Sequence, residues 1–213
     1  MLDRRALLGS LAAITTLHAA PRAAWAQAYP ARPVKVIVPF APAGPADVLA
    51  RLMMTKLSQS MGQQFYIENR AGAGGNLGMG AAARSAPDGY TLIVHQVALA
   101  SGVWLFPKMG LNPEKDLMPV GLITSSPVVI AGRKTLPVDT LAELPNWMKQ
   151  NAPAKFAHAG PGSLAHMCAA QFVQAIGAPA DLIPYRGGGP ANGDLIAGHV
   201  DLMCASLAAA IPQ

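Results

Sequence analysis

Short apolar runs alternate along the chain with longer segments in which apolar residues recur every three or four positions. The run at 34–38 is almost continuously apolar, which is typical of a parallel strand covered on both faces. The segment 46–61 that follows ends before Gly62, a common helix stop, and one helical face carries Leu49, Leu52, Met53 and Leu57. The pattern therefore begins with a strand followed by an amphipathic helix.

The same alternation continues to the end of the chain. It predicts strands at 64–67, 90–94, 120–124, 128–131, 155–159, 182–185 and 199–203, and helices at 77–85, 141–150, 163–176, 191–197 and from Ser206 onward. Such an order favours an α/β fold with parallel or mixed sheets flanked by helices. A polar connector at 112–116 suggests that the chain crosses between two lobes in this region. We expect the first lobe to span 27–104 and the second to span 105–213.

The first 26 residues have the pattern of a secretory signal. Arg4 and Arg5 precede an apolar stretch at 6–17, and Ala24-Trp25-Ala26 fits a small-x-small cleavage site. The stretch is short for a membrane anchor, and the arginine pair leaves Sec and Tat export open. We therefore expect a periplasmic protein.

Composition and charge narrow the class of partner. Hydrophobic residues make up 52% of the chain and charged residues 13%, which indicates a core-rich globular protein. Aromatic residues account for only 6% and no Lys/Arg run occurs, so we expect no nucleic-acid partner. Of the net charge of +5, the first 26 residues carry +2, which leaves a mildly basic remainder suited to an anionic ligand.

The two cysteines allow two interpretations. Cys168 lies at helical spacing on an apolar stripe with Ala165, Phe172 and Ile176, which favours buried free thiols. Export would permit a disulfide with Cys204, and that alternative stays open. Neither the cysteines nor the histidines have ligand spacing, so we predict no metal and no other cofactor.

Three Gly-rich loops occur where a predicted strand ends and a helix begins, at 39–47, 68–78 and 159–166. The start of a helix offers unpaired backbone N–H groups to an anion. The loop at 68–78 lacks the spacing of a dinucleotide fingerprint or a P-loop, and on local physics alone a tight turn with close strand–helix packing is the favoured interpretation.

Together these loops resemble the Bug-type receptors of the tripartite tricarboxylate transporter family. The motifs that carry the resemblance, in order along the chain, lie at 29–33, 39–40, 47–51, 68–76, 87–92, 160–166 and 184–187. The resemblance implies a non-enzymatic, monomeric periplasmic receptor of the type II binding-protein fold. It also implies that a small carboxylic acid binds between two lobes, held largely by backbone N–H groups, and passes to a membrane permease.

Carried onto this sequence, the resemblance gives a set of expected ligand-binding residues: Phe40, Ala41, Ala43, Gly44, Asp47, Gln96, Gly160, Gly162, Ser163, His166, Tyr185, Arg186 and Gly187. Several have structural alternatives. Asp47 and Ser163 can cap the helices that follow them, His166 can cover the first helical turn, and Arg186 can be a solvated cation.

The sequence also departs from the family pattern. Ala43 and Pro45 stand where glycines are usual, and His158 replaces a small residue. Family members also continue further, so we expect an incomplete first lobe and weakened binding.

The sequence raises two alternative functions. A secreted hydrolase would use Ser163 as nucleophile with His166 or His158 as base, but the G-x-S-x-G elbow is missing. An exported sensory protein that presents its ligand to a sensor fits the sequence as well as a transport receptor does.

Overall fold

A computed structural model describes residues 28–151 and 153–207. The chain divides into the units Met1–Ala31 and Arg32–Gln213, and all that follows concerns the second unit. The predicted signal at 1–26 and the continuation of a helix beyond residue 207 lie outside the described residues.

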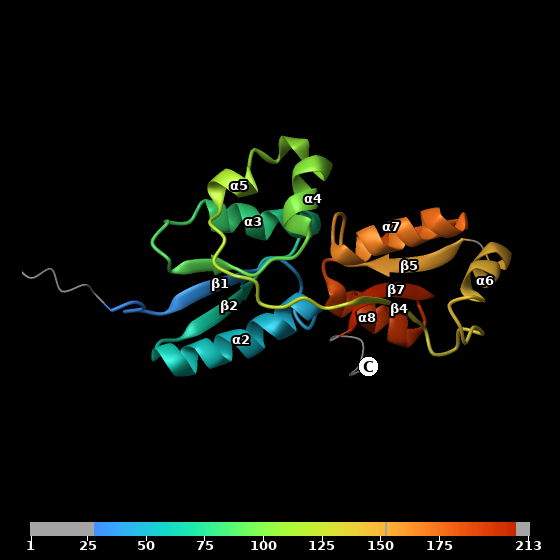
Figure 1. The fold of residues 1–213 in the computed structure, drawn as a ribbon, viewed down its shortest axis with the longest axis horizontal. Helices are drawn as coiled ribbons and strands as arrows, with labels where there is room; N and C mark the ends of the chain where they lie inside the picture. The colour runs from blue at the N-terminus through green and yellow to red at the C-terminus, as the bar shows by residue number, and fades with distance from the viewer. Residues whose placement is uncertain (1–27, 152, 208–213) are drawn as a thin grey trace, which may run out of the picture. The chain divides into compact units, whose positions relative to one another are not determined.

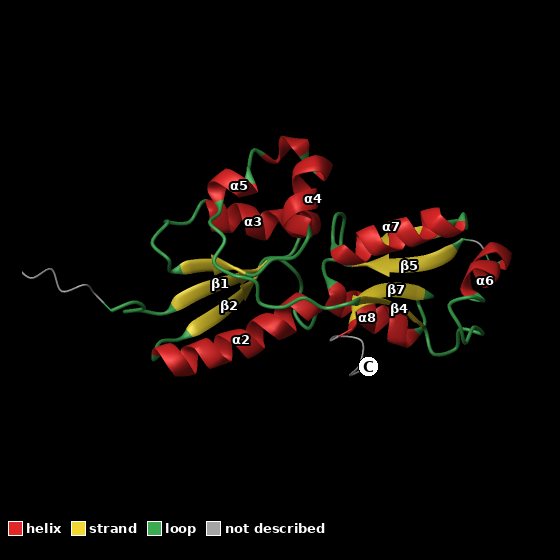
Figure 2. Cartoon of the chain, in the orientation of Figure 1, coloured by secondary structure: helices red, strands yellow, loops and turns green. Residues whose placement is uncertain are grey.

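The first sheet has three parallel strands in the order β2-β1-β3, formed by β1 (Val34–Val38), β2 (Phe65–Asn69) and β3 (Thr91–Ile93). The apolar residues of the central strand β1 are fully buried, as its composition predicts. Helix α2 (Pro45–Met61) packs on one face of the sheet and α3 (Asn76–Ala83) on the other (Figures 1 and 2).

The second sheet has four strands in the order β4-β7-β5-β6. Strands β5 (Ala154–His158), β6 (Ala180–Pro184) and β7 (Leu202–Ser206) run parallel, and β4 (Val128–Gly132) pairs antiparallel to β7. Helix α7 (Leu164–Ile176) covers one face and α8 (Gly188–Ala197) the other, while α6 (Leu144–Gln150) adds to the α7 side. Phe156 and Ala157 point to these two cores in turn, as expected for a strand buried on both faces.

Short helices connect the two sheets, and the sequence pattern did not predict them. These are α4 (Ala98–Leu105), α5 (Pro113–Asp116) and the 3-10 turn Pro107–Met109. A second unpredicted 3-10 turn, Ala73–Gly75, lies between β2 and α3. Helix α4 packs against α3 and α5. The predicted lobe boundary at 104/105 falls within the last turn of α4 and stays a prediction.

The predicted strand at 120–124 is wrong. Residues 117–127 have no regular structure, and Met118, Val120 and Leu122 are 86%, 84% and 86% exposed. Their alternating apolar pattern is strand-like, but a strand also needs a hydrogen-bonding neighbour, and none pairs with this segment in the described part of the chain.

The last strand begins later than predicted, at Leu202 rather than 199, and Ser206 is its last residue. Leu207 is already helical, one residue after the predicted helix start. The residues just before this strand make other contacts than strand pairing. The His199 amide donates a hydrogen bond to the Asp194 carbonyl oxygen, and the Asp201 carboxylate pairs with Arg133. The α/β class with parallel and mixed sheets flanked by helices is confirmed.

The favoured interpretation of two free thiols is also wrong. Cys168 on α7 and Cys204 on β7 form a disulfide with their Cα atoms 6.2 Å apart. The helical stripe placed Cys168 in the core correctly, but pattern alone could not show that β7 lies directly beneath it.

No helix in the described part of the chain is long and apolar enough to cross a bilayer.

Candidate functional site

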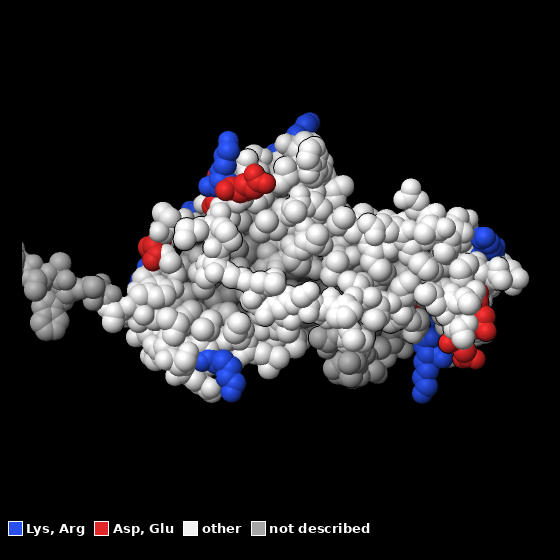
Figure 3. Space-filling model, viewed as in Figure 1, with Lys and Arg blue, Asp and Glu red and all other residues white. Residues whose placement is uncertain are grey.

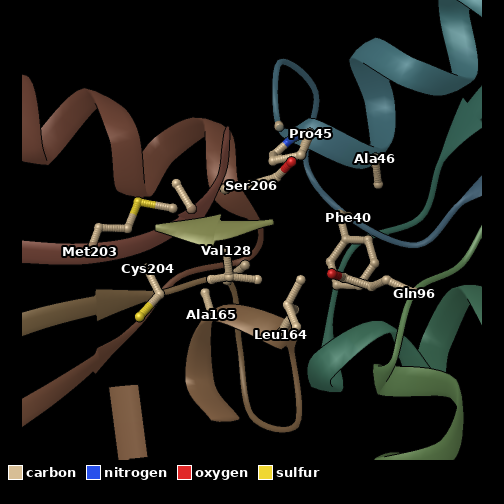
Figure 4. A pocket seen from close by; sticks show the side chains of 14 residues that line it. Phe40, Pro45, Ala46, Gln96, Val128, Leu164, Ala165, Met203, Cys204 and Ser206 are labelled. Carbon is tan, nitrogen blue, oxygen red and sulfur yellow. The ribbon is translucent and has the colours of Figure 1, made fainter. Parts of the chain in front are cut away.

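Three helices begin around one small cavity of about 50 Å³ (Figure 4). The first turn of α2, the first turn of α7 and the first residue of α8 all contribute to its wall, together with the carboxyl end of β7. The residues that line it are Phe40, Gly44, Pro45, Ala46, Gln96, Val128, Ala159, Leu164, Ala165, Gly188, Met203, Cys204, Ala205 and Ser206. Such a meeting of helix N-termini concentrates positive partial charge.

Local sequence explains why α2 begins at this wall. Gly44 is the extended residue before the helix, and Pro45 is its first residue, where a missing N–H removes no helical hydrogen bond. Ala43 just before them has a φ of +62°, the left-handed conformation that favours glycine. The departure from glycine at this position therefore places an alanine in a strained backbone conformation.

Asp47 holds this loop and does not line the cavity. The residue is 2% exposed, and its carboxylate accepts hydrogen bonds from the Ala43 amide at 3.0 Å, from Arg51 at 2.8 Å and from Asn69 at 2.8 Å. Burial alone would raise the pKa of the Asp47 carboxyl, but these hydrogen bonds outweigh it and lower the pKa. Its carboxylate is therefore occupied with closing the turn that starts α2.

The start of α7 is capped as predicted, because the Ser163 hydroxyl accepts a hydrogen bond from the His166 amide at 3.2 Å. Two imidazoles hold the preceding loop: His166 Nδ1 accepts from the Gly162 amide at 3.1 Å and His158 Nδ1 from the Gly160 amide at 3.3 Å. Their ring centroids are 4.5 Å apart. These two glycine amides are therefore engaged by histidines within the loop.

The start of α8 lies against the loop that follows β1. The Ala41 amide donates to the Arg186 carbonyl oxygen at 2.9 Å. A Cβ atom on Gly187 would lie 2.7 Å from the Ala41 nitrogen, and one on Gly189 would lie 2.2 Å from the Pro42 oxygen. Only glycines allow this approach of two main chains, and it brings α8 to the same cavity as α2.

A second hollow of about 60 Å³ borders the first, and both share Phe40 and Ala159. Its other lining residues are Gly72, Ala73, Gly74, Gly75, Gly160, Pro161, Tyr185 and Arg186. The Tyr185 hydroxyl donates to the Asp194 carboxylate; burial, this hydrogen bond and the negative charge of Asp194 raise the pKa of Tyr185 to about 12. Tyr185 therefore contributes an uncharged phenol to the lining of this hollow at neutral pH, while the Arg186 side chain is exposed.

His95 lies next to Gln96 at the edge of the first sheet. Its Nδ1 accepts from the Gln96 amide at 2.9 Å, and its Nε2 is buried with no hydrogen-bond partner in the described part of the chain. Burial lowers the pKa of His95 to about 4, so it adds no charge at neutral pH. Among the described residues, no group of three or more His, Cys, Asp or Glu side chains could hold a metal ion.

The structure therefore divides the expected ligand-binding residues into three groups. Phe40, Gly44 and Gln96 line the first cavity, and Gly160, Tyr185 and Arg186 line the second hollow, which Phe40 also borders. The rest line neither and shape the loops instead: Ala41, Ala43, Asp47, Gly162, Ser163, His166 and Gly187.

Sequence reasoning missed the wall contributed by β7 and β4, from Met203 to Ser206 together with Val128. One general signal could have found the β7 part, since ligands of open α/β sheets bind outside the carboxyl ends of the parallel strands. The error of three residues in the position of the last strand hid that signal.

Comparison with known proteins identifies the family. Residues 49–213 match the tripartite tricarboxylate transporter family receptor, and the chain belongs to this family. It is 41% identical over 196 residues to a UPF0065 protein of Agrobacterium vitis, covering 91% of this chain and 57% of the relative. It is 41% identical over 178 residues to protein BugT of Bordetella pertussis, covering 82% and 55%.

Solved structures agree with this assignment. The periplasmic binding protein BugD superposes with a TM-score of 0.81 at 36% identity, over 84% of this chain and 60% of BugD. MatC from Rhodopseudomonas palustris with bound malate superposes with a TM-score of 0.78 at 38% identity, over 86% of this chain and 63% of MatC. An R. palustris protein with adipate gives a TM-score of 0.82 at 33% identity, over 86% of this chain and 62% of that protein. The chain thus spans somewhat over half the length of its relatives.

These relatives settle two points. The fold is that of periplasmic binding proteins, and the family is one of receptors rather than enzymes. The geometry at Ser163 agrees, because its hydroxyl meets the main-chain amide of His166, while the His166 ring accepts from Gly162. The arrangement is a helix cap and not a nucleophile with its base.

Proposed function

We propose that the cavity at the starts of α2, α7 and α8 binds the carboxylate of a small organic acid. The chain then acts as the ligand-binding part of a periplasmic receptor that passes the acid to the permease subunits of a tripartite transporter. The convergence of these three helix starts on one cavity carries the proposal. The related structures with bound malate and with adipate support the same ligand class.

The charge of the wall fits an anion. No Asp or Glu occurs among the described residues that line the cavity, and the nearby Asp47 is neutralised by Arg51. A helix N-terminus stabilises an anion by about 0.3–1 kcal/mol when exposed and up to about 2 kcal/mol when partly buried. Three such ends fall short of the roughly 8 kcal/mol that micromolar binding needs. Direct hydrogen bonds and burial of the acid's carbon atoms must therefore supply the remainder.

The wall itself offers a sharp test. Ala46 is the second residue of α2 and lines the cavity. Ala46→Glu would bring a carboxylate to the place proposed for the ligand, at a helix position where an acid favours folding. Ala46→Gln is the matched control of the same size without charge.

Thermal melts would be recorded for wild type and both variants, with and without a panel of mono-, di- and tricarboxylates. We expect one acid to raise the melting temperature of wild type and Ala46→Gln, and to leave Ala46→Glu unmoved. A ligand at 100 times its Kd stabilises by about 2.7 kcal/mol, a readily measured shift. A panel without effect on wild type, or an equal shift in Ala46→Glu, would contradict the proposal.

A further inference from the structure

We propose that this cavity selects an acid with a single carboxylate and an uncharged, largely apolar tail. The inference rests on the proposed function and refines it to a ligand class. It starts from the composition of the wall. The helix N-termini can stabilise one anionic group, but the wall has no cationic side chain that could stabilise a second.

Charged side chains are missing from the described wall of the cavity. Its polar side chains are those of Gln96 and Ser206, and the remainder is apolar or glycine: Phe40, Gly44, Pro45, Ala46, Val128, Ala159, Leu164, Ala165, Gly188, Met203, Cys204 and Ala205. Cys204 is tied in a disulfide and does not ionise. A second carboxylate would therefore be buried against apolar atoms without a counter-charge, which is strongly unfavourable.

On the face in Figure 3, the Lys and Arg side chains lie toward its margins and are not gathered at its middle. Two arginines close in sequence to residues of the wall are engaged or placed elsewhere. Arg51 pairs with the buried Asp47, and Arg186 lines the neighbouring hollow with an exposed side chain. Phe40 stands in the wall shared by the two hollows. A second carboxylate within the first cavity would therefore have no arginine in the wall beside it.

The apolar part of the wall is suited to hold a short carbon chain. Figure 4 shows Val128, Leu164, Ala165, Met203 and Cys204 around the cavity, with Phe40 and Gln96 beside each other. Burial of one methylene group corresponds to roughly a fourfold gain in affinity. A volume of about 50 Å³ lies well below the roughly 300–1,000 Å³ of pockets for drug-sized ligands, so the tail must be short.

The two polar side chains of the wall, Gln96 and Ser206, can form hydrogen bonds with an uncharged polar substituent of the ligand. The Ser206 hydroxyl donates to Ser126 Oγ at 2.9 Å, so its oxygen lone pairs remain to accept a hydrogen bond. The Gln96 amide both donates and accepts. A hydroxyl or keto group next to the carboxylate would suit these partners better than a second charge.

The test is calorimetric titration of the chain at pH 7.5 with acids matched in length: butyrate against succinate, 2-hydroxybutyrate against malate, and hexanoate against adipate. We expect the monocarboxylate of at least one pair to bind at least ten times more tightly than its partner. Equal or tighter binding of the dicarboxylates would overturn this inference and leave the carboxylate site intact. Failure of all six acids to bind would overturn both.

Substitution at Gln96 gives an independent test. Gln96→Arg adds a cation to the wall, and we expect it to raise dicarboxylate affinity at least tenfold relative to the matched monocarboxylate. Gln96→Leu is the uncharged comparison: loss of the amide should weaken binding of hydroxy acids, but without an added cation it should not shift the preference toward the dicarboxylate. Gln96→Lys serves as a second charged variant if Gln96→Arg fails to fold. An unchanged preference in a folded cationic variant would overturn the inference.

Discussion

The Ala41 amide donates a hydrogen bond of 2.9 Å to the carbonyl oxygen of Arg186, and this bond joins the loop after β1 to the loop before α8. The first loop also starts α2, so the bond couples two of the three helix starts that surround the cavity. Because both partners are main-chain atoms, the contact depends on close backbone approach rather than on any side chain.

Gly187 makes that approach possible, and Gly187→Ala should break it. The added Cβ would lie 2.7 Å from the Ala41 nitrogen, within the range that forces the backbone to move. We expect a loss of about 1–3 kcal/mol in the free energy of unfolding and a weaker response to acids, measured by urea unfolding. Gly193→Ala in α8 is the control, since its Cβ would meet nothing within 4 Å, and it should stabilise slightly.

Ala43→Gly should stabilise the protein. Ala43 has a φ of +62°, which costs an L-residue roughly 1–2 kcal/mol and costs glycine little. Glycine's greater freedom in the unfolded chain offsets part of this gain, so we expect about 0.5–1 kcal/mol in chemical unfolding. Ala197→Gly, on an exposed helical position in α8, should show the opposite sign. Destabilisation by both changes would argue against the left-handed conformation at Ala43.

Asp47→Asn should lower stability more than it alters affinity. The substitution removes the charge that Arg51, Asn69 and the Ala43 amide surround in a buried site. We expect a loss of about 1–3 kcal/mol in urea unfolding, with an acid-binding constant changed less than threefold. Asp88→Asn removes an exposed partner of Arg32 and should cost under about 1 kcal/mol. A large loss of affinity with unchanged stability would mean that Asp47 contacts the ligand.

Stability should fall as pH is lowered below neutrality. In the unfolded chain a histidine titrates near 6.5, whereas burial lowers the pKa of His95 to about 4 in the folded state. Between pH 4 and pH 6.5 the unfolded state binds the proton and the folded state does not. The free energy of unfolding is therefore at its full value above pH 6.5 and declines as the pH falls toward 4. Burial also lowers the pKa of His158, which adds to the trend.

At pH 5 the His95 contribution alone amounts to a loss of roughly 2 kcal/mol relative to pH 7.5, measurable by urea unfolding at each pH. His95→Asn keeps an acceptor near the position of Nδ1 but cannot titrate, and it should remove this part of the decline. An equal decline in His95→Asn would show that other groups cause it.

How far the sequence could predict this molecule depended on local pattern. The buried run at 34–38, the caps at Ser163 and Gly62, and the helical stripe through Cys168 are consequences of neighbouring residues, and the structure agrees with them. Export of the chain and its lobe boundary at 104/105 stay predictions.

Contacts between distant segments could not be predicted in the same way. The disulfide between Cys168 and Cys204 depends on α7 lying on β7, and the irregular course of Val120 depends on which strands find partners. At the candidate site, glycine-rich loops marked the helix starts, but many named residues proved to support those loops. The apolar residues that form much of the wall, such as Met203, carry no chemical signature in sequence.

Carboxylate binding at the three helix starts is tested most directly by an amide chemical-shift map of the isotopically labelled chain as one organic acid is added. We expect the largest changes at the first-turn amides of α2, α7 and α8, at Ala46, Ala165 and Gly188, all of which line the cavity. Saturating changes confined to the loop 72–75, or no changes with any acid of the panel, would contradict it.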